Sequence, residues 1–207
     1  MKLNRLYTWI IAIAVVLFLF ANYTQADDIL SRDDATVIAT IKSTLPNVVN
    51  LDQGSGFYID STHVITCWHV IEDTAFNGKV WIENYQGERI QGEIVSSNID
   101  IDYAILKVPL NANVRALEPS NPEVGQGVII IGNPFGILPF TATKGMVANL
   151  VRYGSKHHRN IQLDATLNHG NSGSIVMDLY GKVIGMAVAG TKEGLGIGFV
   201  IPIGDIK

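Results

Sequence analysis

A serine between two glycines marks the stretch of this chain whose residue types could do covalent chemistry. Residues 164–174 read D-A-T-L-N-H-G-N-S-G-S. Glycine has no Cβ, so Gly170 and Gly173 would let the backbone aim consecutive N–H groups at one point beside the serine. We therefore expect Ser172 to be a nucleophile, with the N–H groups of Gly170, Asn171 and Ser172 as its oxyanion hole.

The same residue types also suit an ordinary turn between strands, because Gly, Asn and Ser favour turns. A catalytic interpretation needs a base for the hydroxyl and a carboxylate that orients the base. His69 lies in T-C-W-H-V-I and Asp102 in D-Y-A-I-L-K, so the chain order is His, Asp, Ser. No histidine follows Ser172, which excludes the Ser, Asp, His order of α/β-hydrolases.

Two neighbouring side chains compete for these roles. Asp100 is a rival for the orienting carboxylate, since it lies two residues before Asp102. His169 lies three residues before Ser172, but a base must approach the hydroxyl from across the cleft. We therefore expect His169 on the surface of the loop.

Short alternating segments separated by turn residues predict the elements that hold these side chains. Twenty Gly and seven Pro favour a turn-rich, all-β protein. A short amphipathic helix is expected at 33–43, a strand end and turn at 68–71, and a polar loop at 96–101. The expected strands are 45–50, 57–60, 63–67, 79–85, 88–95 and 103–108, then 128–131, 140–152 (one or two strands), 161–163, 175–177, 183–189 and 196–201.

These strands form two groups of about six, which predicts two small antiparallel β-barrels, at about 45–110 and 120–207. The junction of two such barrels is a favoured place for a binding cleft. His69 and Asp102 would reach it from the first barrel and Ser172 from the second.

The N-terminal segment is typical of a signal peptide or a signal anchor. Lys2 and Arg5 precede an apolar segment at about 6–23, which is just long enough to span a bilayer. We expect residues 1–26 to be this segment and 27–207 to be one extracytoplasmic domain, in the periplasm or secreted. Membrane contact through residues 6–23 stays open.

Charge and cysteine content narrow the function classes. The formal charge is −4, and residues 1–26 contribute +2, so the remainder carries −6. An acidic domain without a basic stripe argues against nucleic-acid binding. Cys67 is the one cysteine, which excludes an internal disulfide, and we interpret it as a buried core residue. No zinc-site spacing is present, and we expect no metal and no cofactor.

Residues 54–202 resemble the chymotrypsin-fold serine proteases, and among them the HtrA (Deg) proteases. Six segments carry the resemblance, in family order. They are G-S-G-F from Gly54, V-I-T with H-V-I around His69, D-Y-A-I-L-K from Asp102, I-G-N-P-F-G from Ile131, G-N-S-G from Gly170, and G-I-G-F-V-I-P from Gly196.

The resemblance implies peptide-bond hydrolysis through an acyl-enzyme, with Ser172 as nucleophile, His69 as base and Asp102 as its orienting group. It implies polypeptide substrates, misfolded or regulatory, cleaved after small apolar residues, with Thr166 in the substrate pocket. His169 and Ser174 replace the usual Pro and Gly, which leaves open a weak protease that binds unfolded chains or a partner. Family members often carry PDZ domains and form trimers; we expect a protease domain alone, and a homotrimer stays open.

Overall fold

The computed structural model describes the backbone of residues 5–73, 75–153, 159–188 and 196–207. Side chains are described for the same residues except 5–9, 19–32, 151–153 and 159. The chain divides into two compact units, residues 1–39 and 40–207, and each is considered by itself.

The first unit consists of most of one helix, α1 (Arg5–Thr44), which includes the helix expected at 33–43. Where side chains are described, no helix is both long enough and apolar enough to cross a bilayer. Much of the segment at 6–23 lies outside that part of the chain. The signal or anchor at 1–26 therefore stays a prediction.

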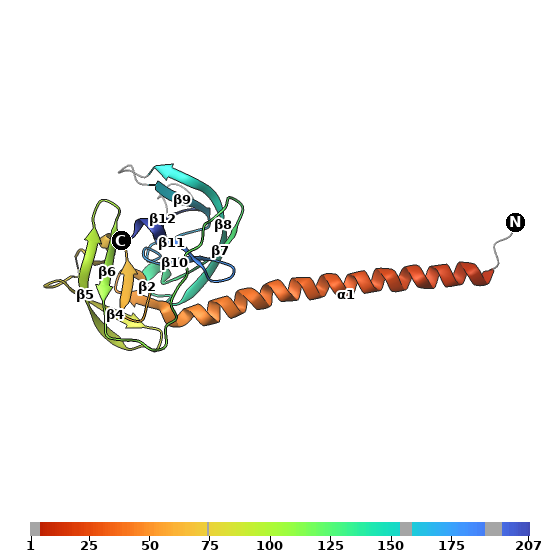
Figure 1. Cartoon of the computed structure of the whole chain (residues 1–207), viewed down its shortest axis with the longest axis horizontal. Helices are drawn as coiled ribbons and strands as arrows, with labels where there is room; N and C mark the ends of the chain where they lie inside the picture. The colour runs from red at the N-terminus through yellow and green to blue at the C-terminus, as the bar shows by residue number, and fades with distance from the viewer. Residues whose placement is uncertain (1–4, 74, 154–158, 189–195) are drawn as a thin grey trace. The chain divides into compact units, whose positions relative to one another are not determined.

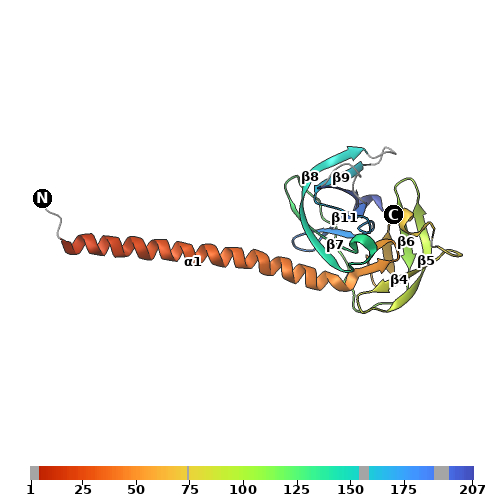
Figure 2. The ribbon, with the colours of Figure 1, turned by 180° about the vertical axis from the view of Figure 1, so that it is seen from behind.

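The second unit holds two closed six-stranded antiparallel barrels, which confirms the predicted chymotrypsin-like fold (Figures 1 and 2). Neighbouring strands in the first barrel follow the order β1-β2-β3-β6-β5-β4, and pairing of β1 with β4 closes it. Its strands are β1 (Val48–Leu51), β2 (Gly54–Tyr58), β3 (His63–Thr66), β4 (Lys79–Asn84), β5 (Arg89–Asn98) and β6 (Tyr103–Lys107).

The second barrel follows the order β10-β11-β12-β9-β8-β7, and pairing of β7 with β10 closes it. Its strands are β7 (Gly127–Gly132), β8 (Thr141–Tyr153), β9 (Arg159–Asp164), β10 (Ile175–Asp178), β11 (Val183–Val188) and β12 (Ile197–Pro202). Short 3-10 turns complete the unit: η1 (Leu45–Asn47), η2 (Pro134–Gly136) and η3 (Ile203–Asp205).

Each barrel is closed around its own apolar core. In β4 the burial alternates, so that Val80 and Ile82 are buried while Lys79 and Trp81 are exposed, as a strand with one solvated face requires. One buried cluster in the second barrel joins residues of all six strands and the 165–167 segment. Its members are Val128, Ile130, Val147, Ile161, Leu163, Ala165, Leu167, Val176, Ile184, Ala187 and Val200.

The structure differs from the sequence prediction in two places and decides a third that the sequence left open. Residues 68–71 form a four-residue helix, α2 (Trp68–Ile71), rather than a strand end and turn. The expected loop at 96–101 is partly strand, because β5 continues to Asn98 by pairing with β6 beyond a register shift between Ile94 and Ser96. The segment at 140–152, predicted to hold one or two strands, forms one long strand, β8, whose pairing with β9 contains two register shifts.

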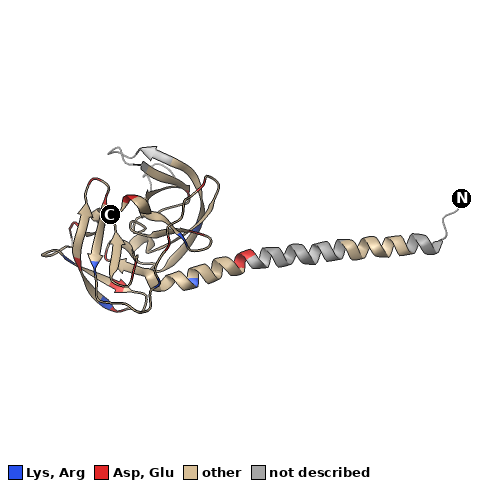
Figure 3. Ribbon diagram, in the orientation of Figure 1, with Lys and Arg blue, Asp and Glu red and all other residues tan. Residues whose placement is uncertain are grey.

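Hydrogen bonds from the first barrel hold the C-terminal residue. The Tyr103 hydroxyl donates to the carbonyl oxygen of Lys207 at 2.7 Å, and Ser96 Oγ donates to the same oxygen at 3.2 Å. The segment after β12 is therefore attached to β5 and β6 as well as to its own barrel. On the described part of the barrels, acidic and basic residues are interspersed, with no continuous basic stripe (Figure 3).

Candidate active site

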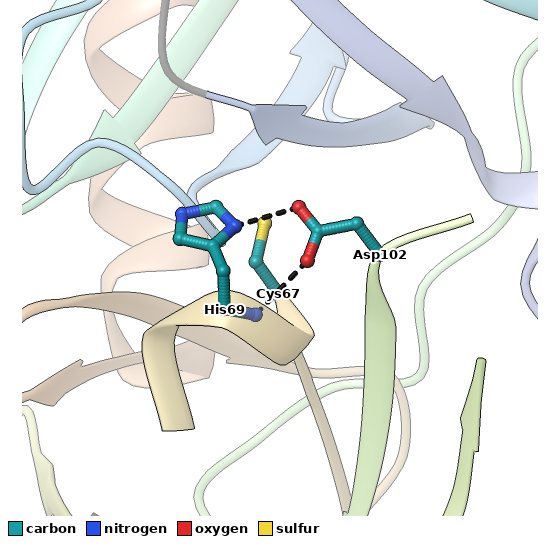
Figure 4. A group of neighbouring side chains, drawn as sticks. All are labelled: Cys67, His69 and Asp102. Carbon is teal, nitrogen blue, oxygen red and sulfur yellow. Dashed lines mark hydrogen bonds and ion pairs between the residues drawn. The ribbon is translucent and has the colours of Figure 1, made fainter. Parts of the chain in front are cut away.

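His69 and Asp102 form a hydrogen-bonded pair at the edge of the first barrel (Figure 4). Asp102 Oδ2 lies 2.6 Å from His69 Nδ1, and Asp102 Oδ1 accepts the backbone N–H of His69 at 2.9 Å. A carboxylate can only accept, so Nδ1 carries the proton and the neutral ring keeps its lone pair on Nε2. The imidazole is thus held in the tautomer that a general base needs.

Local backbone structure explains this geometry. One residue, Cys67, separates β3 from α2, and His69 is the second residue of that helix. Asp102 precedes β6, the strand beside β3, and has a φ of 70°. Aspartate is among the few residues that tolerate this left-handed conformation. In this backbone conformation, the Asp102 N–H donates to the carbonyl oxygen of Asn98 at 2.8 Å, and both carboxylate oxygens of Asp102 bond to His69.

The electrostatic surroundings favour protonation of His69. The hydrogen bond to Asp102 raises the pKa of the imidazole above its ordinary 6.5, against the lowering effect of partial burial. The negative charges of Asp102 and Glu72 act in the same direction. An imidazolium formed during catalysis would be stabilised by the same contacts.

Ser172 lies in the loop between β9 and β10 of the second barrel and is 3% exposed. Gly170 and Gly173 flank it with φ values of 90° and 86°, as the sequence predicted for a special backbone conformation. A Cβ on Gly173 would also collide with the carbonyl oxygen of Ser55. Close packing against the first barrel therefore requires glycine here in addition to its dihedral freedom.

Gly54 of β2 packs against both the segment that carries His69 and the loop that carries Ser172. The Cβ position of Gly54 is 2.7 Å from Val70 Cγ2, in the residue after His69, and 2.9 Å from the Ser172 carbonyl oxygen. The backbone N–H of Ser55 donates to that same oxygen at 2.8 Å. β2 therefore packs between α2, which carries His69, and the loop that carries Ser172.

One member of the predicted oxyanion hole already has a hydrogen-bond partner. The N–H of Asn171 donates to the carbonyl oxygen of Asn168 at 3.0 Å, so a turn within the loop uses it. Gly170 keeps its N–H without an acceptor among the described residues. Its preceding peptide is fixed, because Phe135 donates its N–H to the His169 carbonyl at 2.5 Å. In a trans peptide the Gly170 N–H then points away from Phe135.

Three other residues named in the sequence analysis are all exposed in the structure. His169 is exposed, as expected for a residue on the loop surface. Asp100 is exposed, and Asp102 rather than Asp100 contacts His69. Thr166 is exposed between the buried Ala165 and Leu167, and its place in a substrate pocket stays a prediction.

Cys67 lies under the His69–Asp102 pair and is fully buried, as the sequence predicted. Burial raises the pKa of its thiol well above the ordinary value, and the charge of Asp102 acts in the same direction. Its Sγ donates to the Ala187 carbonyl at 3.5 Å. Ligand-type atoms of Cys67, His69 and Asp102 lie within 4.8 Å of one another. A protonated thiol and an Nδ1 already bonded to a carboxylate make this set a poor metal site.

Comparison with known proteins identifies the family. Residues 54–186 match the model of the trypsin-like peptidase domain. The chain belongs to the trypsin-like peptidase family. The periplasmic serine endoprotease DegP of Escherichia coli (strain K12) is 33% identical over 165 residues, which are 74% of this chain and 34% of DegP.

Solved structures agree with this assignment. The HtrA-type protease AlgW with tripeptide aligns with a TM-score of 0.72 at 28% identity, over 81% of this chain and 60% of that one. The serine endoprotease from Yersinia pestis aligns with a TM-score of 0.71 at 27% identity, over 81% and 62% of the two chains. The resemblance to HtrA proteases is thus confirmed. The chain spans 32–41% of the length of the first curated relatives that it matches.

Proposed function

We propose that this chain is an extracytoplasmic serine endopeptidase. In the proposed mechanism, Ser172 attacks the peptide carbonyl, His69 removes its proton and delivers it to the leaving amine, and Asp102 holds the ring. The observation that carries the proposal is the 2.6 Å contact between His69 Nδ1 and Asp102 Oδ2, which leaves Nε2 as the basic atom. The loop that carries Ser172 packs on β2, the strand that also contacts α2.

We infer that the oxyanion hole consists of the N–H groups of Gly170 and Ser172. The direction of the Gly170 N–H supports this role, because the contact between Phe135 and His169 fixes the peptide plane. Both donors are backbone groups, which need no reorganisation as negative charge develops on the substrate oxygen.

The proposed substrates are polypeptides cleaved after small or medium apolar residues such as Val, Ala or Thr. Trypsin-like cleavage after Lys or Arg needs a carboxylate in the pocket, and Thr166 stands at the expected position. Relatives named as periplasmic serine endoproteases support an extracytoplasmic location. The part played by residues 1–26, a homotrimer and a role in protein quality control remain proposals from the family resemblance.

Digestion of an unfolded protein by the full chain tests this function. Carboxymethylated α-lactalbumin is incubated with the parent, Ser172→Ala and His69→Ala, and mass spectrometry identifies the residue before each cut. Cleavage by the parent alone, mainly after small apolar residues, is the expected result. Mostly Lys or Arg before the cuts would contradict the proposed pocket. Binding without cleavage by any of the three proteins would instead indicate the non-catalytic alternative.

A further inference from the structure

Ser55 of β2 places its hydroxyl between the two barrels, in contact with the nucleophile loop. The side chain is fully buried. Its Oγ donates to the Gly170 carbonyl at 2.9 Å and accepts the backbone N–H of Asn133 at 2.8 Å. One hydroxyl of the first barrel therefore joins two segments of the second, the Ser172 loop and the segment that follows β7.

The backbone of the same residue makes two further contacts. The Ser55 N–H donates to the Ser172 carbonyl at 2.8 Å, and the Ser55 carbonyl accepts from Thr66 Oγ1 at 2.8 Å. Ser55 thus holds the carbonyl groups on both sides of Asn171. The Thr66 contact in turn anchors Ser55 to β3.

We propose that Ser55 is a positioning residue for the oxyanion hole. This inference rests on the proposed function and deepens it. Two successive carbonyl oxygens are fixed, His169 by Phe135 and Gly170 by the Ser55 hydroxyl. The Gly170 N–H lies in the peptide plane that the Phe135 contact fixes, and fixing the next plane, on the other side of the Gly170 Cα, keeps the first from turning. The hydroxyl donates its single hydrogen to the Gly170 carbonyl, so a side chain without a donor leaves that plane held only by the Asn171 N–H bond to Asn168.

Steric limits explain why serine suits this position. The Cβ position of Gly132 is 2.8 Å from Ser55 Oγ, so little free volume surrounds the hydroxyl. The additional methyl of threonine would have to fit into this contact. Cysteine keeps the unbranched shape and a weak donor, which makes Ser55→Cys the conservative variant.

Ser174 supplies a matched control. Its side chain is fully buried in the same region, and its Oγ has no hydrogen-bond partner among the residues that the structure describes. Ser55→Ala and Ser174→Ala therefore delete the same atom from two buried serines, one bonded and one unbonded. Removal of an unpartnered buried hydroxyl is expected to be neutral or stabilising.

The test is hydrogen–deuterium exchange of the peptide covering residues 168–174 in the full-length parent, Ser55→Ala, Ser55→Cys and Ser174→Ala. The N–H groups of Asn171, Gly173 and Ser174 are hydrogen-bonded in this segment and report its order. Exchange about tenfold faster in Ser55→Ala, with the parent rate in Ser174→Ala and an intermediate rate in Ser55→Cys, is expected. Peptides from β4 and β8 should keep their parent rates. Equal exchange at 168–174 in the parent and Ser55→Ala would overturn the inference, as would uniform acceleration over the chain.

Kinetics with a chromogenic peptide, together with binding of a peptide boronate, give the catalytic readout. Ser55→Ala is expected to lose tenfold to a hundredfold in kcat with little change in KM, and to bind the tetrahedral boronate adduct correspondingly less tightly. A rise in KM at unchanged kcat would contradict a positioning role. An inactive parent would refute the proposed function, and the exchange comparison would still decide the role of Ser55.

Discussion

The backbone N–H of Ser55 lies 2.8 Å from the carbonyl oxygen of Ser172, and it is a direct bond between the barrels at the proposed nucleophile. Ser55 belongs to β2 of the first barrel, next to α2 and His69. Ser172 belongs to the β9–β10 loop of the second. The relation between base and nucleophile therefore depends on how the barrels pack, and changes at this contact should affect chemistry before they affect the separate cores.

Gly173→Ala is predicted to abolish activity and to destabilise the fold by about 2–4 kcal/mol, because a Cβ would meet the Ser55 carbonyl and a φ of 86° strains alanine. Gly125→Ala is the control, since Gly125 has a φ of 91° but open space around its Cβ position. It should cost only about 1–2 kcal/mol and keep full activity. Urea unfolding and peptide hydrolysis measure both effects. Equal losses in the two variants would mean that strain, not packing, explains the glycine.

Asp102→Asn is predicted to fold and to lose about 10⁴-fold in kcat. Asparagine tolerates the φ of 70° at this position, but its amide can present a donor to Nδ1 and favour the wrong tautomer. Asp100→Asn, two residues away and exposed, should leave kcat unchanged. Steady-state kinetics measure kcat of both variants, and circular dichroism checks that both are folded. Comparable losses at both positions would refute the assignment of Asp102.

The pH dependence of kcat/KM should follow His69. The base acts when deprotonated, and the Asp102 hydrogen bond raises its pKa, so the acidic limb should lie above pH 6.5. Glu72→Gln removes one of the charges that raise this pKa and should move the limb to lower pH. Asp73→Asn, at the next exposed position, is the matched control. An unchanged limb in Glu72→Gln would show that the Glu72 charge is screened.

The same shift predicts how His69 contributes to stability. A pKa that is higher in the folded protein than in the unfolded chain favours folding of the protonated form. This contribution is fully present below the ordinary pKa of 6.5 and is lost as pH rises through the raised folded value. A His69→Ala variant should therefore lose more stability, relative to the parent, at pH 5 than at pH 9. A loss that grows with pH would contradict the direction of the shift.

The thiol of Cys67 should be inert in the folded protein. It is fully buried and its pKa is raised, so little thiolate exists to react. Titration with 5,5′-dithiobis(2-nitrobenzoic acid) should detect no thiol under native conditions and one thiol in guanidinium. Rapid native labelling would mean that the space under the His69–Asp102 pair opens readily.

Motif order and glycine placement made much of this architecture predictable. The His, Asp, Ser order and two sets of about six short strands identified the paired barrels and assigned His69 and Asp102 to one of them and Ser172 to the other. The glycines were informative because glycine adopts positive φ values, such as those at Gly170 and Gly173, at little steric cost.

Contacts between distant segments could not be predicted in the same way. The bond from the Ser55 hydroxyl to the Gly170 carbonyl depends on which groups meet once the barrels close. The G-S-G-F sequence carries part of the family resemblance, but nothing in it shows that its serine bonds to a residue 115 positions later. The helix α2 could not be predicted, because four residues are too few for a hydrophobic pattern to distinguish a helical turn from the end of a strand.

The central claim, an activated serine at position 172, is tested most directly by mass spectrometry after reaction with a fluorophosphonate. The full-length parent is compared with Ser172→Ala, His69→Ala and Ser174→Ala. The account predicts one adduct on Ser172 in the parent and in Ser174→Ala, and no adduct in the other two. An adduct on another residue, or none in a parent that unfolds cooperatively, would contradict it.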